Sequence, residues 1–360
     1  MVAMDESWKM RNGLTIPNRS VLAAMTNKQS HADGTLSNEE IRFLTRRAEG
    51  GFGIITTAAS HVQESGQGWE GEFGVWSDHH LPGLTLLASQ LKEHPCKSFV
   101  QVFHGGMRAP SSITGHRACS ASENFISEHE GFSRSLELSE VEETINAFVQ
   151  AAKRCEEAGF DGVELHGAHG YLIAQFLGSK TNRRQDAFGG DVEQRCTFLL
   201  RIIRGIRDVV RDEFAIMVRL SPVSDEIGIT MEDTKQVIDL LIKEKIDALH
   251  ISCWDVFEKQ DNDQTITKEL CTIYSESIPI VSTGSVWTAE DAQFVLDQGA
   301  QAVGVARVAL PHPDWASIVS NPTYSPSRPP FTPKELQQAD LSPTFVDYMR
   351  RWRGFVTDGR

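Results

Sequence analysis

The chain has little of three features that mark common classes of protein. Its six cysteines are scattered over 360 residues and no two form a C-x-x-C pair, which excludes the usual zinc and iron–sulfur spacings and favours reduced thiols. No apolar run approaches the roughly 18 residues of a membrane helix. The charged start, MVAMDESWKMRNG, contains no apolar signal core. We therefore expect a cytoplasmic protein that does not associate with a membrane.

Positive charge is also in short supply. The 35 Lys and Arg residues are outnumbered by 49 Asp and Glu, which gives a formal net charge of −14. An acidic surface disfavours nucleic acid as a partner. We expect a small-molecule substrate instead. The sequence is compatible with a homodimer or a homotetramer and does not decide between them.

The chain does have a regular alternation of short apolar runs with longer amphipathic stretches, in the order that produces parallel sheets. Eight strands are predicted, over Ser20–Thr26, Gly53–Ala58, Ser98–His104, Gly162–His166, Ile216–Leu220, Ala248–Ser252, Pro279–Thr283 and Ala302–Ala306. Helices are predicted over Asn38–Glu49, Leu84–Lys92, Val141–Glu157, Val192–Val210, Glu232–Lys245 and Ala289–Leu296, with caps at Ser37, Ser139, Thr230 and Thr288. Eight strand–helix repeats in this length indicate an α/β fold, the closed (β/α)₈ barrel.

Two stretches lie outside the repeat. Residues 105–138 are rich in Gly, Pro and Ser and are expected to form an excursion over the barrel mouth after the third strand. A Pro-rich segment at 322–333 precedes a helical tail predicted over Pro343–Phe355. With no linker between them, we expect one domain over residues 1–360, with the barrel at about 18–320 and the tail at 321–360.

Active residues of such barrels lie where the strands end. The fourth predicted strand leads into His166, His169 and Tyr171, which supply two hydrogen-bond donors and a weak acid. This set suits holding a carbonyl oxygen and protonating the carbon beside it. Two other interpretations stay open: Glu164, His166 and His169 as the metal triad of a barrel hydrolase, or histidines and a tyrosine with purely structural roles.

Gln101 and Arg219 stand on strands among apolar neighbours, where each needs a partner. A flavin ring would supply amide-like edges for Gln101 and an electron-rich N1/C2 carbonyl region for Arg219. An internal salt bridge from Arg219 to a core carboxylate such as Glu164 is the competing interpretation.

The last two strands end in Ser282-Thr283-Gly284-Ser285 and Gly304-Val305-Ala306-Arg307. Phosphate sites of barrels are commonly built there, and Arg307 would add charge-assisted bonds. Ordinary tight turns are the alternative. The arginines near Asp186 and Glu193 are interpreted as an ion-pair network that braces a loop.

Together these residues resemble the old yellow enzyme family of flavin-dependent ene-reductases, over about residues 18–310. The motif HGAHGYLIAQFL…TNRRQDAFGG…EQR carries most of the resemblance, with further matches at Asn18-Arg19, Gln101, His104-Gly105-Gly106, Arg219 and Thr283-Gly284. The resemblance implies a barrel that binds FMN non-covalently, accepts hydride from NAD(P)H and reduces α,β-unsaturated carbonyl compounds. A flavin barrel acting as an oxidase or isomerase remains an alternative.

Residue by residue, the resemblance implies that FMN is lined by Ala23, Ala24, Met25 and Thr26, backed by Ala58, bonded by Gln101 and Arg219, and held at its phosphate by Gly284, Ser285, Gly304, Ala306 and Arg307. His166 and His169 would bind the substrate carbonyl oxygen and Tyr171 would donate the proton. The tail at 350–355 either enters a neighbouring subunit's active site, as in some members, or is a solvated end.

Overall fold

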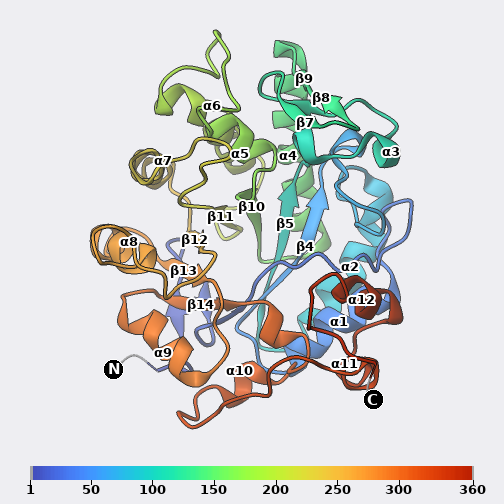
Figure 1. Ribbon diagram of the computed structural model, residues 1–360, viewed down its shortest axis with the longest axis vertical. Coiled ribbons are helices and arrows are strands. Elements are labelled where there is room, and N and C mark those ends of the chain that lie inside the picture. The colour runs from blue at the N-terminus through green and yellow to red at the C-terminus, as the bar shows by residue number, and fades with distance from the viewer. Residues whose placement is uncertain (1–2, 359–360) are drawn as a thin grey trace.

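A closed barrel of eight parallel strands forms the centre of the protein, as the computed structural model shows for residues 3–358 (Figure 1). Its strands follow one another in chain order: β3 (Ser20–Leu22), β4 (Ile54–His61), β5 (Lys97–Phe103), β10 (Gly162–Gly167), β11 (Ala215–Leu220), β12 (Ala248–Ser252), β13 (Ile280–Thr283) and β14 (Ala302–Val305). The predicted (β/α)₈ fold and all eight predicted strands are confirmed. The first strand is shorter than predicted, because the chain leaves the sheet after Leu22.

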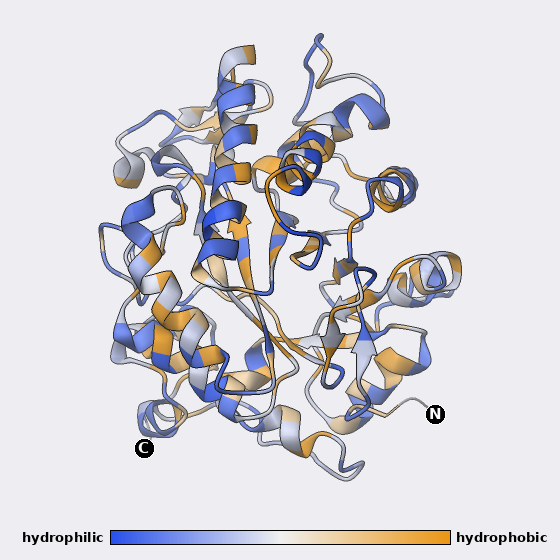
Figure 2. Ribbon diagram, turned by 180° about the vertical axis from the view of Figure 1, so that it is seen from behind, coloured by the Kyte–Doolittle hydropathy of each residue, from blue (hydrophilic) through white to orange (hydrophobic). Residues whose placement is uncertain are grey.

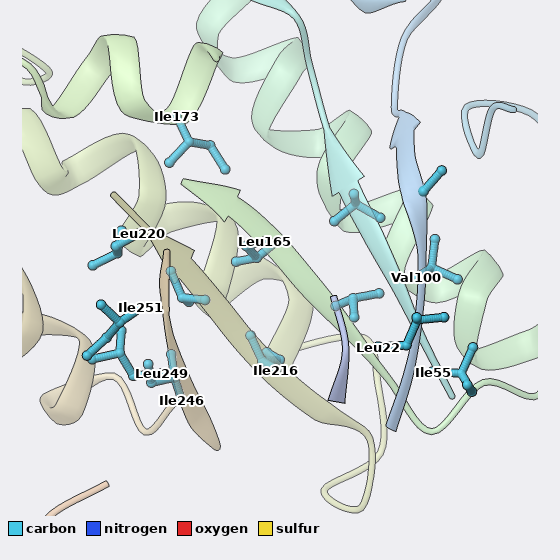
Figure 3. Close-up of a cluster of buried hydrophobic side chains, with 14 of the residues drawn as sticks. Leu22, Ile55, Val100, Leu165, Ile173, Ile216, Leu220, Ile246, Leu249 and Ile251 are labelled. Atoms are coloured by element: carbon cyan, nitrogen blue, oxygen red, sulfur yellow. The ribbon is translucent and has the colours of Figure 1, made fainter. Parts of the chain in front are cut away.

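Alternation along the strands divides the core into two layers. Leu22, Ile55, Val100 and their equivalents point outward to the helices, and Figure 3 shows part of this cluster. Val21, Ile54, Phe99 and their equivalents point inward and fill the lower barrel, which is plugged by the hairpin β1 (Trp8–Lys9) and β2 (Thr15–Ile16). Because the bottom is filled with apolar side chains, polar chemistry is confined to the upper end.

Helices surround the barrel, and in Figure 2 their turns are coloured in both blue and orange, as expected of amphipathic helices. They are α1 (Asn38–Glu49), α2 (Leu81–Leu91), α4 (Leu138–Ala158), α5 (Leu172–Leu177), α6 (Val192–Arg207), α7 (Met231–Lys243), α8 (Ile266–Tyr274) and α9 (Ala289–Asp297). Ser37, Thr230 and Thr288 cap their helices as predicted. The cap predicted at Ser139 is wrong: Glu137 is the cap, and its backbone N–H donates to the Glu140 side chain.

The excursion after β5 contains η3 (Gly106–Arg108), α3 (Ser111–Thr114) and two small sheets, β6 (Cys119–Ser120) with β9 (Arg134–Ser135) and β7 (Phe125–Ser127) with β8 (Gly131–Phe132). Short 3₁₀ turns are η1 (Glu64–Gly66), η2 (Asp78–His80) and η4 (Arg307–Ala309). Within residues 3–358, no helix is both long and apolar enough to cross a membrane.

The tail contains α10 (Trp315–Ile318), α11 (Pro333–Gln338) and α12 (Pro343–Met349), so the helix predicted over Pro343–Phe355 ends early. In Figure 1 the tail lies beside α1. There Phe345 is fully buried, with its ring centroid 5.1 Å from that of Phe43. This contact anchors α12 to the barrel of its own chain.

Candidate active site

Polar side chains occupy the upper end of the barrel, two residues further along the strands than the inward apolar layer. Strand register places Glu164 beside Gln101, and His166 and His250 on either side of Arg219. One sequence pattern therefore produces both the dry base of the barrel and its polar mouth.

Glu164 is the centre of a buried hydrogen-bond chain. Gln101 Nε2 donates to Glu164 Oε1 at 2.6 Å, and His250 Nδ1 lies 2.6 Å from Oε2. Burial acts to raise the pKa of Glu164, but the neighbouring His250, Arg219 and Gln101 outweigh it and hold the pKa below its usual value. Burial also lowers the pKa of His250. The pair is thus a carboxylate accepting from a neutral imidazole, whose Nε2 accepts from the Thr283 hydroxyl at 2.5 Å.

His166, His169 and Tyr171 gather just beyond β10. The His166 ring centroid lies 5.0 Å from those of His169 and Tyr171, with the rings at 90° and 65°. His169 adopts a positive φ of 57°, which turns the chain back over the barrel mouth. Its backbone N–H donates to Ser221 Oγ and its Nε2 lies 2.9 Å from Ser252 Oγ.

All three side chains are neutral at physiological pH. Burial lowers the pKa of His166 well below its usual value. Desolvation of the His169 ring and the charge of Arg219 lower its pKa to about 3, although the residue as a whole is exposed. Burial raises the pKa of Tyr171 to about 12. Each imidazole therefore carries one N–H donor, and the phenol keeps its proton.

Arg219 is buried and only partly hydrogen-bonded. Its Nη2 donates to Ser252 Oγ at 3.1 Å, while its Nε has no partner among the described residues. The interpretation that Arg219 forms a salt bridge with Glu164 is wrong, because that carboxylate is paired with His250. A buried guanidinium with an unused N–H requires an electron-rich partner at the mouth.

The remaining candidate positions lie around this centre. The loop Ala23–Thr26 follows β3, and Ala23 N–H bonds Val305 O at 2.9 Å. Ala58 lies in the bulge of β4 between Thr56 and Ala59, next to the residue that pairs with Gln101. On the last two strands Gly304 pairs with Thr283, and a Cβ on Gly304 would stand 1.8 Å from the Thr283 hydroxyl, so only glycine fits there.

Beyond these strands lie Ser285, whose hydroxyl donates to the Trp254 carbonyl at 3.3 Å, and Arg307, whose donors no described residue uses. Ser285 has a positive φ of 59°. Ala306 is the cap of η4, and the following Arg307 is exposed, with no hydrogen bond or ion pair to any described residue. The structure thus brings Gln101, Glu164, His166, His169 and Arg219 together at the upper end of the barrel, where Glu164 bonds Gln101 and His250 while Ser252 joins His169 to Arg219.

The metal triad does not form, because both oxygens of Glu164 are engaged by Gln101 and His250. Across residues 3–358, no group of three or more His, Cys, Asp or Glu side chains is placed to hold a metal ion.

The arginine cluster is structural, but not in every detail as predicted. Arg184 pairs with Asp186 at 2.6 Å and also bonds backbone carbonyls. Glu193 has no ion pair among the described residues, and Arg195, further along, pairs with Asp233 at 2.9 Å.

Sequence reasoning missed His250, Ser252 and Ser221. His250 sits mid-strand in ALHIS, where it continues an ordinary alternation, and the two serines look like common strand-end residues. Only their distance to partners on other strands shows their role.

The tail of the chain also reaches this region. Lys28 Nζ lies 5.8 Å from the ring centre of Tyr348, and the Arg351 guanidinium lies 5.2 Å from the same ring. Arg351 also acts electrostatically on Tyr171. The tail therefore packs beside the site of its own chain.

Comparison with known proteins agrees with this geometry. The sequence pattern of the NADH:flavin oxidoreductase / NADH oxidase family matches residues 8–324. The chain belongs to this family. The resemblance to the old yellow enzymes is thereby confirmed, and the protein is an FMN-dependent flavin oxidoreductase that takes electrons from NAD(P)H.

Several relatives of this flavin oxidoreductase span most of its length. It is 34% identical to the probable NADH-dependent flavin oxidoreductase YqiG of Bacillus subtilis, over 86% of each chain, and 32% identical to an NADPH dehydrogenase of Geobacillus, over 84% and 89%. It is 30% identical to an NADH:fumarate oxidoreductase of Klebsiella pneumoniae, of which it spans only 36%. An old yellow enzyme homologue from Zymomonas mobilis has the same fold, with a TM-score of 0.81 at 24% identity over 95% and 99% of the two chains.

Proposed function

We propose that this flavin oxidoreductase reduces the C=C bond of α,β-unsaturated carbonyl compounds. The observation that carries the proposal lies at the end of β10 and in the turn after it, where the neutral His166 ring lies 5.0 Å from the neutral His169 ring and 5.0 Å from the protonated Tyr171 ring. Hydrogen-bond donors and an acid on one turn suit a substrate whose oxygen gains charge while its neighbouring carbon is protonated.

FMN fits the residues at the mouth. The unpartnered Nε of Arg219 would meet the electron-rich N1/C2 side of the ring, Gln101 the pyrimidine edge and Thr26 the C4 carbonyl. Ala23, Ala24, Met25 and Ala58 would lie against the ring, since they are small or flexible and carry no competing charge. The phosphate would lie against the backbone of Gly284, Ser285, Gly304 and Ala306, with the free Arg307 as its counter-charge.

When bound, FMN supplies the hydride that is taken from NAD(P)H and delivered to the β-carbon of the substrate. His166 and His169 donate to the carbonyl oxygen and stabilise the negative charge that develops on it. His166 Nδ1 accepts from the Ala168 N–H at 3.4 Å, which leaves its Nε2–H for the substrate. Tyr171 gives its proton to the α-carbon. Its pKa of about 12 keeps it protonated across the working range of pH.

The test is an anaerobic absorbance experiment on the purified holoprotein, with NADPH added first and cyclohexenone second. Bleaching of the flavin followed by its recovery supports the proposal. Bleaching without recovery would sink ene-reduction, whereas a flavin that NADPH does not bleach would favour an oxidase or isomerase of the same fold.

Tyr171→Phe separates the two half-reactions. We expect reoxidation by cyclohexenone to slow by about 10²–10⁴-fold, the usual contribution of a general acid, while reduction by NADPH keeps its rate. Stopped-flow traces measure both. Tyr274→Phe is the matched control, because that hydroxyl bonds Lys235 O on the outer layer. Equal loss in both half-reactions would remove Tyr171 from its role.

A further inference from the structure

Arg108 lies against the turn that carries the proposed catalytic groups. It is the last residue of η3, directly after β5, and so stands at the mouth of the barrel. A Cβ built on Gly170 would lie 3.1 Å from both Nε and Nη2 of Arg108, so the guanidinium rests on the glycine between His169 and Tyr171. The same charge acts on both neighbours, whose pKa values it lowers.

The guanidinium is held loosely and has donors to spare. Among the described residues its one hydrogen-bond partner is Glu226, with Nη2 at 3.1 Å from each carboxylate oxygen. Both partners are exposed, the arginine side chain to 41% and the glutamate to 70%. An ion pair this exposed is weak and easily exchanged for another anion. Nε and Nη1 have no hydrogen bond to any residue between 3 and 358 and are available to a ligand.

The backbone under Arg108 is fixed, in contrast to its side chain. Gln175 is fully buried and accepts from the Met107 N–H at 3.1 Å through Oε1. Its Nε2 donates to the Gly170 carbonyl at 2.8 Å. One buried amide therefore sets the position of η3 relative to the His169–Tyr171 turn. Because its backbone is held at a fixed distance from the turn, Arg108 can bind a second group of a substrate at a set distance from the reacting end.

Positive side chains lie around the mouth of the barrel, although the chain as a whole is negatively charged. The chain carries a net charge of −14, yet Lys28 and Arg351 also lie in this region, 5.8 and 5.2 Å from the centre of the Tyr348 ring. The groups expected to touch the substrate are neutral, so they would not repel an anion. Local positive charge on an acidic protein attracts negatively charged small molecules to this opening.

From this geometry we infer that Arg108 determines specificity by binding an anionic group, a carboxylate or a phosphate, on a molecule whose reacting end lies at His166, His169 and Tyr171. The inference rests on the proposed function and names its preferred substrates: unsaturated carbonyl compounds with a negative charge, or the phosphorylated form of the nicotinamide. Arg108 forms no covalent bond in this role and moves no proton.

The test compares matched ligand pairs on the holoprotein. The oxidants are 4-oxopent-2-enoate, an enone with a carboxylate, and its neutral methyl ester; the reductants are NADPH and NADH. Arg108→Gln removes the charge, Arg108→Lys retains it, and Glu226→Gln frees the guanidinium. Arg201→Gln is the control, since that arginine is also 41% exposed and pairs with one glutamate, Glu142, far along the outer layer.

We expect Arg108→Gln to lower the acid-to-ester ratio of kcat/KM at least tenfold, Arg108→Lys to restore part of it, and Glu226→Gln to raise it. A fall in the NADPH-to-NADH ratio instead would identify the phosphate of the reductant as the anion. If neither ratio changes by more than twofold, or if Arg201→Gln changes them equally, the inference is wrong.

Failure of the proposed ene-reduction would give a different result from failure of the inference about Arg108. The wild-type flavin would then be bleached by NAD(P)H and reoxidised by neither the acid nor the ester. Dissociation constants of both compounds, from their perturbation of the oxidised flavin spectrum, would still report on Arg108. A tenfold loss of acid binding over ester binding in Arg108→Gln would support the inference in that case, and equal loss would overturn it.

Discussion

Two buried arginines in this protein, Arg47 and Arg219, differ in how fully their guanidinium groups are hydrogen-bonded. Arg47 donates to three backbone carbonyls, those of Phe43, Ala309 and Leu310, at 2.8–3.1 Å. Arg219 has one hydroxyl partner and an orphaned Nε. Satisfied burial stabilises a fold, whereas an under-bonded buried charge costs free energy that a ligand can recover. This difference distinguishes a structural arginine from an arginine whose unused N–H donor is available to a cofactor.

Arg219→Met should therefore weaken FMN binding by about 10–100-fold, since a hydrogen bond to a charged group contributes about 1.5–3 kcal/mol. The same change should leave the free energy of unfolding of the FMN-free protein unchanged or raise it. Fluorescence titration with FMN and urea unfolding of the apoprotein measure the two effects. Arg47→Met is the control and should destabilise both forms. Loss of apoprotein stability in Arg219→Met would show that the residue is structural.

Single residues could be predicted from sequence where their chemistry conflicts with their surroundings. Gln101 and Arg219 are polar among apolar neighbours, and the conflict alone marks them. The partner of Glu164 could not be predicted, because His250 lies 86 positions away and contacts it only across the closed barrel. Strand register, which a single sequence does not contain, decides that contact.

At the scale of elements, the excursion and α5 are held together by one side chain. Gln175, on α5, bonds Gly105 and Met107 in the segment leading into and through η3, Ser120 in β6, and Gly170 in the turn before its own helix. The sequence predicts an excursion here but not its attachment, since the strands β6 to β9 are two or three residues long and lack a periodic pattern.

Gln175→Leu should lower the free energy of unfolding by about 2–4 kcal/mol, because it leaves buried N–H, O–H and carbonyl groups without partners. It should also slow reoxidation by enone more than reduction by NADPH, since the His169–Tyr171 turn loses its anchor. Urea unfolding and the two half-reactions measure this. Gln185→Leu, on an exposed loop position, is the control. Similar losses in the two variants would contradict the bracing role.

At the scale of the whole molecule, the barrel was predictable because its signal is repeated eight times. Errors at single boundaries, such as the first strand and the cap at Ser139, do not disturb the count. The position of the tail was not predictable in the same way. Its contact with α1 is made by Phe345 against Phe43, and nothing local to either residue indicates the other.

The molecule also buries an unusual set of titratable groups whose effects on stability add up. Burial lowers the pKa of His166 and His250, lowers those of His61 and His169 to about 3, and lowers those of His80 and His104 to about 4. A histidine with a depressed pKa stabilises the fold above its unfolded value near 6.5 and loses that contribution as the pH falls. Unfolding at pH 5 would thus be favoured by protons that only the unfolded chain binds.

Two buried carboxyls oppose this effect. Burial raises the pKa of Glu72 well above its usual value and that of Glu40 to about 7, so the folded chain keeps these protons in the range where unfolded glutamates lose them. Their contribution is present at low pH and lost as the pH rises through the folded values. Against six histidines, two carboxyls leave up to four protons in favour of unfolding.

The free energy of unfolding should therefore fall as the pH is lowered from 7 to 5, with a slope of up to about 5 kcal/mol per pH unit, four times the 1.36 kcal/mol of one proton. Urea unfolding at half-unit intervals measures the slope. His104→Gln should reduce it by about one proton, because burial lowers its pKa and it has no carboxylate partner. A stability that stays flat or rises toward pH 5 would mean that these imidazoles are charged in the folded state, which would also remove the neutral donors from the proposed site.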